Sequence, residues 1–214
     1  MTHYPIILTG PLAAVVIGGG QVAERKVQGL LQGGAEVTVI SPRLSSTLAH
    51  LAQTGRIRAI LRCYLPGDLA GARLAIAATD DAAVNAAVAE EACRRGCLIN
   101  VVDDPQRCTF YVPAVIRRGE ITVSISTAAA SPALARYLRR QLEASIPPEY
   151  GQLAGILAEL RPQWRAGEVR DRPPELAWEQ LIEAALALLR EGRIEEARKL
   201  ARGFICQEDG EGAR

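Results

Sequence analysis

Apolar residues follow two alternating patterns over the first half of the chain. Continuous apolar runs predict buried strands, and stretches with an apolar residue at every third or fourth position predict helices that end near glycines. The runs cover residues 13–17, 36–40, 57–61, 74–78 and 98–102, and the helical stretches cover residues 22–32, 41–53 and 82–95. Strands that alternate with helices in this way indicate an α/β fold with a doubly wound parallel (Rossmann) sheet.

The pattern changes after residue 110. Two runs, residues 111–117 and 121–126, flank Arg118-Gly119-Glu120 and predict a β-hairpin. Ser131 followed by Pro132 predicts the start of a helix that continues to about Ala144.

Further helices are predicted near the end of the chain by apolar residues at 153–157, 181–189 and 194–200. A proline- and arginine-rich linker is predicted near residues 166–174, and a loose tail from Gln207 onwards. The patterns together predict three parts: a nucleotide-binding domain at residues 1–112, a small α+β segment at 113–146 and a C-terminal helical domain at 147–214.

A glycine motif stands between the first strand and the first helix. Gly18-x-Gly20-x-x-Ala23 matches the dinucleotide-binding fingerprint in its required context. Gly18 permits a tight turn, Gly20 lets a pyrophosphate approach the backbone, and the helix N-terminus offers N–H groups to the phosphates. An ordinary glycine-rich turn is the alternative, but the strand and helix on either side favour a nucleotide site.

Ligands of such sheets bind beyond the carboxyl ends of the strands. Those ends carry Ser41-Pro42-Arg43, Thr79-Asp80-Asp81 and Asp103-Asp104. The acidic residue that usually binds the ribose is missing from the end of the second strand, where Ser41 and backbone groups can replace it. Arg43 would suit a 2′-phosphate. The sequence therefore does not decide between NAD and NADP as the cofactor. The pair Asp80-Asp81 favours helix capping, with cofactor proximity as a secondary role.

Composition narrows the class of protein. A formal net charge of +1 over 214 residues argues against a general nucleic-acid or membrane-surface binder. The N-terminus lacks signal-peptide features and no apolar run approaches bilayer length, so the chain is predicted to be soluble and cytoplasmic. His3 and His50 are the two histidines, which leaves acid–base chemistry to carboxylates.

The cysteines predict no metal site. Their number, five, is odd, and none of them form a CxxC pair. Cys93 and Cys97 are four residues apart near a helix end, a spacing that would present two thiols on one face, but no second pair completes a zinc site. The remaining cysteines are Cys63, Cys108 and Cys206.

Four separated motifs carry a family resemblance. They are Gly18-Gly19-Gly20-Gln21-Val22-Ala23-Glu24-Arg25-Lys26, Ala77-Ala78-Thr79-Asp80-Asp81 with Asn85, Asn100-Val101-Val102-Asp103, and Ser131-Pro132-Ala133-Leu134-Ala135. In this order, over residues 4–146, the chain resembles precorrin-2 dehydrogenase / sirohydrochlorin ferrochelatase, the N-terminal module of siroheme synthase. The resemblance implies NAD-dependent oxidation of precorrin-2 to sirohydrochlorin and a homodimer joined through residues 113–146, with ferrous iron as a further substrate if the chelatase activity is present.

The resemblance also implies roles for particular residues. The catalytic aspartate falls on Asp103, whose position at a strand end otherwise fits either a general base or the start of a turn. The cofactor contacts of the family fall on Gly18, Gly20, Gln21, Val22, Pro42, Arg43, Thr79 and Asp80. Ser41 is added as a cofactor-binding candidate because it directly follows the second strand.

A tetrapyrrole with many carboxylates needs cations and N–H donors. The candidates for binding it are Thr127, Ser131, Arg117 and Arg136. A solvated basic face, or arginines paired with Glu143 and Glu120, is the alternative for any one arginine. Residues 126–130 carry alanines where the family commonly has glycines, so the shape of this loop stays open.

Three functions therefore compete. The chain is an NAD-dependent precorrin-2 dehydrogenase that also acts as a ferrochelatase, a dehydrogenase that leaves chelation to another protein, or a non-catalytic NAD(H)-sensing regulatory protein with a Rossmann core. The sensor needs neither Asp103 nor a basic substrate site.

Overall fold

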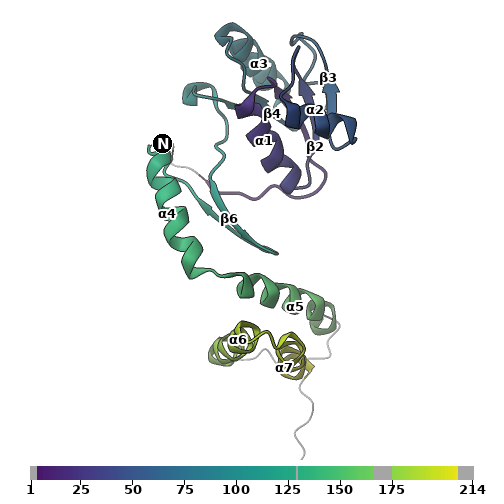
Figure 1. The fold of residues 1–214 in the computed structure, drawn as a ribbon. Coiled ribbons are helices and arrows are strands. Elements are labelled where there is room, and N and C mark those ends of the chain that lie inside the picture. Colours follow the sequence, from purple (N-terminus) through teal and green to yellow (C-terminus); the bar gives the residue numbers. More distant parts are fainter. Residues whose placement is uncertain (1–3, 129, 166–174, 207–214) are drawn as a thin grey trace, which may run out of the picture. The chain divides into compact units, whose positions relative to one another are not determined.

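The computed structural model describes residues 4–128, 130–165 and 175–206. The chain divides into two compact units, Met1–Val112 and Pro113–Arg214 (Figure 1). The predicted linker at residues 166–174 and the tail from Gln207 lie outside the described residues.

The first unit contains a five-stranded, fully parallel sheet. Its strands have the order β3-β2-β1-β4-β5, so the chain moves outward from β1 in one direction and then crosses over to continue in the other. The strands are β1 (Ala13–Ile17), β2 (Glu36–Ile40), β3 (Arg58–Ile60), β4 (Leu74–Ala77) and β5 (Leu98–Val101). This arrangement confirms the predicted doubly wound α/β fold.

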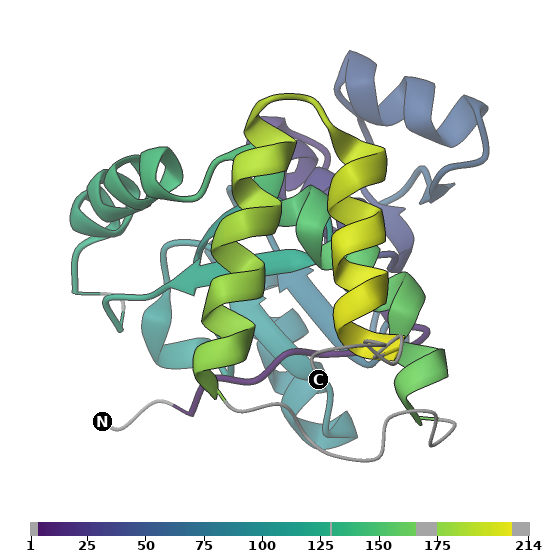
Figure 2. The same cartoon turned by 90° about the horizontal axis from the view of Figure 1, so that it is seen from below.

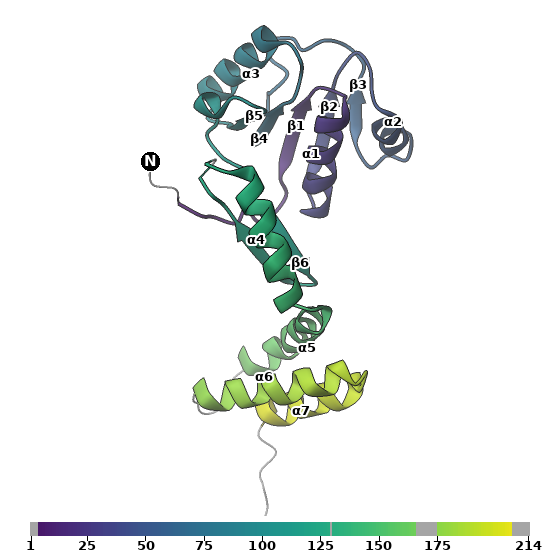
Figure 3. The same cartoon turned by 60° about the vertical axis from the view of Figure 1, so that its left-hand side comes forward.

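Helices cover both faces of this sheet, which explains why the strands are apolar throughout. Helix α1 (Gln21–Gln32) packs on β1 and β2, and α3 (Ala82–Arg95) packs on β4 and β5 (Figure 3). Alternate residues of β1 enter two separate cores: Val16 packs with α1 and α2 (Ser46–Gln53), whereas Val15 packs with α3.

The predicted helix at residues 41–53 is wrong at its beginning, because α2 starts at Ser46. Ser45 is the N-cap, and its hydroxyl accepts a hydrogen bond from the Leu48 amide at 3.2 Å. The Ser45 amide donates to the Gly19 carbonyl at 2.8 Å, so residues 41–45 form a loop held against the glycine turn. Asp81 and Ser131 cap α3 and α4 (Pro132–Ser145) as the sequence predicts.

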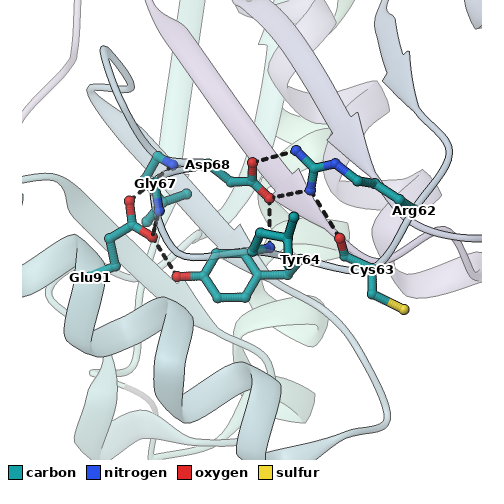
Figure 4. A network of polar contacts seen from close by, with 8 residues as sticks. Arg62, Cys63, Tyr64, Gly67, Asp68 and Glu91 are labelled. Atoms are coloured by element: carbon teal, nitrogen blue, oxygen red, sulfur yellow. Dashed lines mark hydrogen bonds and ion pairs between the residues drawn. The ribbon is translucent and has the colours of Figure 1, made fainter.

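A strap without a helix connects β3 to β4, and Glu91 of α3 holds it in place (Figure 4). The Glu91 side chain, 3% exposed, accepts hydrogen bonds from the Gly67 and Leu69 amides at 2.9 and 3.2 Å and from the Tyr64 hydroxyl. Arg95 Nε donates to the same carboxylate at 2.6 Å. A buried charge is tolerated here because every one of these partners stabilises its ionised form.

The described residues of the second unit form a hairpin and four helices. Strands β6 (Ala114–Arg118) and β7 (Ile121–Ile125) pair antiparallel, as predicted, and α4 packs against them (Figure 1). Helices α5 (Pro148–Arg165), α6 (Glu175–Arg190) and α7 (Ile194–Cys206) share a core of their own that includes Leu153, Leu181 and Ala201. Figure 2 shows α6 and α7 side by side.

Replacing Glu91 tests whether its carboxylate stabilises the strap. We expect Glu91→Ala to lower the free energy of unfolding by about 3 kcal/mol, because it removes the acceptor of the buried Leu69 amide, the Gly67 amide and the Tyr64 hydroxyl. Chemical denaturation of the variant measures the loss. Glu90→Ala, on the exposed face of α3, is the control and should change stability by no more than about 0.5 kcal/mol. Equal effects of both changes would contradict the assigned role.

The ionisation of Glu91 makes its contribution to stability depend on pH. Burial raises the pKa of Glu91, but the hydrogen bonds that it accepts outweigh burial and hold this pKa below the ordinary value. A depressed folded-state pKa adds stability above the unfolded pKa of about 4.3, and this stability is lost as the pH falls through the folded value. The stability difference between the native chain and Glu91→Ala should therefore shrink on acidification below about pH 4.

Candidate functional site at the carboxyl edge of the sheet

The glycine turn after β1 is defined by close backbone contacts. A Cβ on Gly18 would lie 2.2 Å from the Ala78 carbonyl oxygen, and one on Gly19 would lie 1.9 Å from that of Arg43. Gly18 also has a φ of +121°. A Cβ on Gly20 would meet nothing within 4 Å. Gly18 and Gly19 are therefore required by the protein's own packing, whereas Gly20 leaves open space in which a ligand can approach.

Helix α1 begins directly after this open position. Gly20 is its N-cap and supplies no side-chain cap, and Gln21 and Val22 are the first helical residues. The first N–H groups of a helix have no partner within the helix, and the positive end of the helix dipole favours anions. The turn and the helix therefore form a cradle that fits a dinucleotide pyrophosphate.

The loop after β2 closes one side of the turn. Ser41 is buried, and its hydroxyl donates to the Arg43 carbonyl at 2.7 Å. The Ser45 hydroxyl donates to Glu24 of α1 at 2.6 Å. Pro42 and the Arg43 side chain are exposed. The loop is thus fixed from inside, and Arg43 is the charged side chain that it presents.

The end of β4 closes the other side. Thr79 and Asn85 bind each other, with Thr79 Oγ1 to Asn85 Oδ1 at 2.8 Å and Asn85 Nδ2 to the Thr79 carbonyl at 2.9 Å. Asp81 caps α3 by accepting from the Ala83 and Val84 amides. Asp80 takes no part in the capping and is exposed.

Asp103 follows β5 at the same edge of the sheet. Its φ is +60°, a left-handed conformation that aspartate tolerates better than most residues. The carboxylate is exposed and makes no hydrogen bond or ion pair with any residue that the structure describes. Its neighbour Asp104 pairs with Arg107 in the short 3₁₀ turn η1 (Pro105–Arg107).

The chain beyond η1 returns along β5 and fixes this turn. Ile99 donates to Thr109 Oγ1 at 2.8 Å, and Val101 donates to Cys108 Sγ at 3.2 Å. The buried side chain of Asn100 donates to the Phe110 carbonyl at 3.1 Å. Side-chain and backbone groups of residues 108–110 therefore bind the open edge of β5, where a sixth strand would otherwise pair.

Lys26 lies near this turn, and the sequence alone predicts no role for it. It projects half-buried from α1 and approaches Asn100 Oδ1 at 3.4 Å. Burial lowers the pKa of Lys26, while the nearby Cys108 and Asp103 act in the opposite direction. The motif that contains Lys26 provided the available signal, but its link to Asn100 depends on tertiary packing.

The substrate-binding candidates belong to the second unit. Thr127 Oγ1 accepts from the Ser131 amide at 3.1 Å and donates to the Ser131 carbonyl at 3.0 Å, which closes the loop before α4. Ala128 in this loop has a φ of +54°. Arg117 and Arg136 are exposed and form no ion pair with the described residues. Arg139, by contrast, pairs with Glu143 at 2.6 Å.

Cys93 and Cys97 do not share a helical face. Cys93 is exposed on α3, whereas Cys97 is buried one residue beyond Gly96, where the helix has ended in a left-handed cap. Among the described residues, no three or more His, Cys, Asp or Glu side chains gather as a possible metal site. No helix in the same residues is long and apolar enough to cross a membrane.

Comparison with known proteins places this geometry in a family. Residues 10–114 match a family model described as "Putative NAD(P)-binding". The chain is 43% identical over 202 residues to a siroheme synthase of Methylococcus capsulatus, which covers 94% of this chain and 43% of that protein. A siroheme synthase of Methylobacillus flagellatus is also 43% identical, over 80% of this chain and 37% of its own length.

A solved structure matches almost end to end. It is "SirC, precorrin-2 dehydrogenase", with a TM-score of 0.68 and 25% sequence identity over 96% of this chain and 98% of that one. These matches support the assignment of this chain to the precorrin-2 dehydrogenase family. This finding confirms the resemblance predicted from the motifs, and the NAD(P)-binding match supports the predicted nicotinamide dinucleotide cofactor. The chain spans less than half the length of the siroheme synthases.

Two glycine substitutions separate the packing role of the turn from its role in cofactor binding. Gly19→Ala places a methyl group on the Arg43 carbonyl and should lower the free energy of unfolding by at least about 2 kcal/mol. Gly20→Ala adds a methyl group in open space and should cost about 1 kcal/mol or less, yet weaken NAD binding at least about tenfold.

Thermal unfolding and calorimetric titration with NAD measure the two effects. Each variant serves as the control for the other. A stable Gly19→Ala protein, or unchanged NAD affinity in Gly20→Ala, would contradict the interpretation of the turn.

Proposed function

We propose that this protein oxidises precorrin-2 to sirohydrochlorin with NAD as the oxidant in siroheme biosynthesis. The observation that carries the proposal is the placement of the glycine turn and Asp103 at the carboxyl ends of β1 and β5, one edge of a single parallel sheet. Ligands of doubly wound sheets bind at this edge. The siroheme synthase and precorrin-2 dehydrogenase relatives support the choice of substrate.

The reaction removes a hydride and a proton from the tetrapyrrole. NAD, when bound, accepts the hydride and becomes NADH. The carboxylate of Asp103 makes no hydrogen bond or ion pair within the described part of the chain and accepts the proton as a general base. Its backbone is left-handed, and Cys108 and Thr109 fix the turn on the edge of β5.

The second unit supplies groups for the substrate carboxylates. Arg117 and Arg136 carry guanidinium groups that pair with no described carboxylate and are suited to bidentate carboxylate binding. The N-terminus of α4 at Ser131, fixed by Thr127, offers further N–H donors. These residues form the proposed substrate-binding set.

Iron insertion is a second proposed activity of the same carboxylate. Several relatives are named siroheme synthases, and ferrous iron would be a substrate of the chelation step. Metal insertion displaces two pyrrole protons, and Asp103 is the proposed acceptor. The cytoplasm stays the predicted location.

We propose that two copies of the chain associate through the segment of residues 113–146. Helix α4 exposes an apolar stripe made of Leu134, Tyr137, Leu138 and Leu142, with 36–51% of each residue accessible. Positions three and four apart lie on one helical face, so these side chains form one continuous surface. Burial of this surface against a second copy would remove an apolar patch from water.

Asp103 is the residue on which the catalytic proposal depends. We expect Asp103→Asn to bind NAD with native affinity but to oxidise precorrin-2 at least about 100-fold more slowly, because the proton acceptor is lost. Anaerobic absorbance at the sirohydrochlorin bands measures turnover, and addition of ferrous iron measures chelation. Asp104→Asn, whose side chain pairs with Arg107 instead, should retain most of the activity.

The outcomes separate the competing functions. Native turnover of Asp103→Asn would exclude Asp103 as the base. Loss of chelation without loss of oxidation would restrict its role to iron insertion. A native chain that binds NAD but produces no sirohydrochlorin at any protein concentration would favour the NAD(H) sensor.

The dimer has its own test. Leu138→Asp places a charge in the middle of the α4 stripe and should shift the protein from dimer to monomer in sedimentation velocity runs at micromolar concentration. Leu65→Asp, which changes an exposed leucine of the first unit, is the matched control and should remain dimeric. A native protein that sediments as a monomer, or a Leu138→Asp variant that stays dimeric, would contradict the proposed interface.

A further inference from the structure

The end of β2 lacks the group that makes most Rossmann domains selective for NAD. An acidic residue about 20 positions beyond the glycines normally accepts hydrogen bonds from the ribose hydroxyls and repels a 2′-phosphate. Here the loop that replaces it reads Ser41-Pro42-Arg43-Leu44-Ser45 and contains no carboxylate. The loop therefore lacks the usual barrier to a phosphorylated ribose.

Ser41 stands where the acidic residue is expected but is already engaged. It is 7% exposed, and its hydroxyl donates to the Arg43 carbonyl at 2.7 Å. The hydroxyl oxygen also lies 2.7 Å from where a Cβ on Gly19 would be. Ser41 thus serves to shape the loop against the glycine turn, and its donor proton is directed inward.

Glu24 does not replace the missing acid. It is the acidic residue in the first turn of α1, and its carboxylate accepts from the Ser45 hydroxyl at 2.6 Å. This bond ties Glu24 to the far end of the loop, at the N-cap of α2.

Arg43 combines a fixed backbone with a free side chain. Its carbonyl is held by Ser41 and packs against Gly19, and Ser45 anchors the following turn to the Gly19 carbonyl. The side chain is exposed and has no hydrogen bond or ion pair to any described residue. A guanidinium group in this state binds phosphate through paired, charge-assisted hydrogen bonds without breaking an earlier contact.

We infer that Arg43 is a specificity-determining residue that binds the 2′-phosphate of NADP, so that this protein accepts NADP as well as NAD. The inference rests on the dinucleotide site of the proposed function and adds a second cofactor to it. The attraction of one guanidinium offsets the desolvation of the phosphate, and no loop carboxylate opposes it.

Equilibrium titration of the full chain with each dinucleotide, in the absence of tetrapyrrole, tests the inference. Isothermal calorimetry of the native protein should give Kd values for NADP and NAD within about tenfold of each other. Arg43→Ala should weaken NADP binding by about 10- to 100-fold and NAD binding by less than about threefold, because one charged hydrogen-bonding partner of the extra phosphate is lost. Arg43→Lys should restore part of the NADP affinity.

Arg73→Ala is the matched control. Arg73 is an exposed arginine that directly precedes β4, at the amino edge of the sheet and so opposite the dinucleotide, and its removal should leave both affinities unchanged. Adenosine 2′,5′-bisphosphate and 5′-AMP provide a second pair of probes, and Arg43→Ala should weaken only the first.

Failure of this inference is distinct from failure of the proposed function. A native chain that binds NAD but binds NADP more than about 100-fold more weakly would overturn the role of Arg43 and leave the dehydrogenase intact. Equal weakening of both dinucleotides by Arg43→Ala would also overturn it, because the residue would then act on the shared part of the cofactor. A chain that binds neither dinucleotide would overturn both proposals.

Discussion

The first unit depends on close contact between the glycine turn after β1 and the backbone at the ends of the two neighbouring strands. Gly18 lies against the carbonyl of Ala78, and Gly19 lies against the carbonyl of Arg43, both too close for any side chain. The Gly18 amide in addition donates to the Ile40 carbonyl at 3.0 Å. These contacts fix the ends of β1, β2 and β4 relative to one another. They leave Gly20 as the one position of the turn that faces open space.

The opposite faces of the sheet are closed by different means. Helices α1 and α2 cover one face of the sheet, whereas α3 and the strap that follows β3 cover the other face. Leu69 and Tyr64 of the strap enter the same core as Val88 of α3, and Glu91 satisfies the strap's amides where a helix would have satisfied its own. A short strap can replace a crossover helix because a single buried carboxylate accepts several donors at once.

Much of this arrangement follows from local sequence signals. The five strands, the turn at Gly18 and the caps at Asp81 and Ser131 rest on periodicity, glycine and side-chain capping, which act over a few residues. The start of α2 differs from the prediction because backbone groups of residues 41–45 bind the glycine turn, which is remote in sequence. The need for glycine at position 19 is invisible in the sequence for the same reason, because it comes from the close approach of the Arg43 carbonyl. The strap, the link from Lys26 to Asn100 and the burial of Cys97 likewise depend on tertiary contacts that no short-range pattern records.

The acidic residues at the carboxyl edge of the sheet illustrate how structure narrows a choice that sequence leaves open. Asp81 is engaged as the cap of α3, and Asp104 is paired with Arg107. Asp80 and Asp103 remain free among the described residues, and both are exposed. Their surroundings differ. Asp103 has a left-handed backbone, and the return of the chain along β5 holds it in place. The half-buried ammonium group of Lys26 also lies near Asp103. A residue kept in a less favourable conformation by surrounding contacts is better suited to a fixed chemical role than one in a relaxed loop. The local packing thus favours Asp103 over its three acidic neighbours on grounds independent of the family.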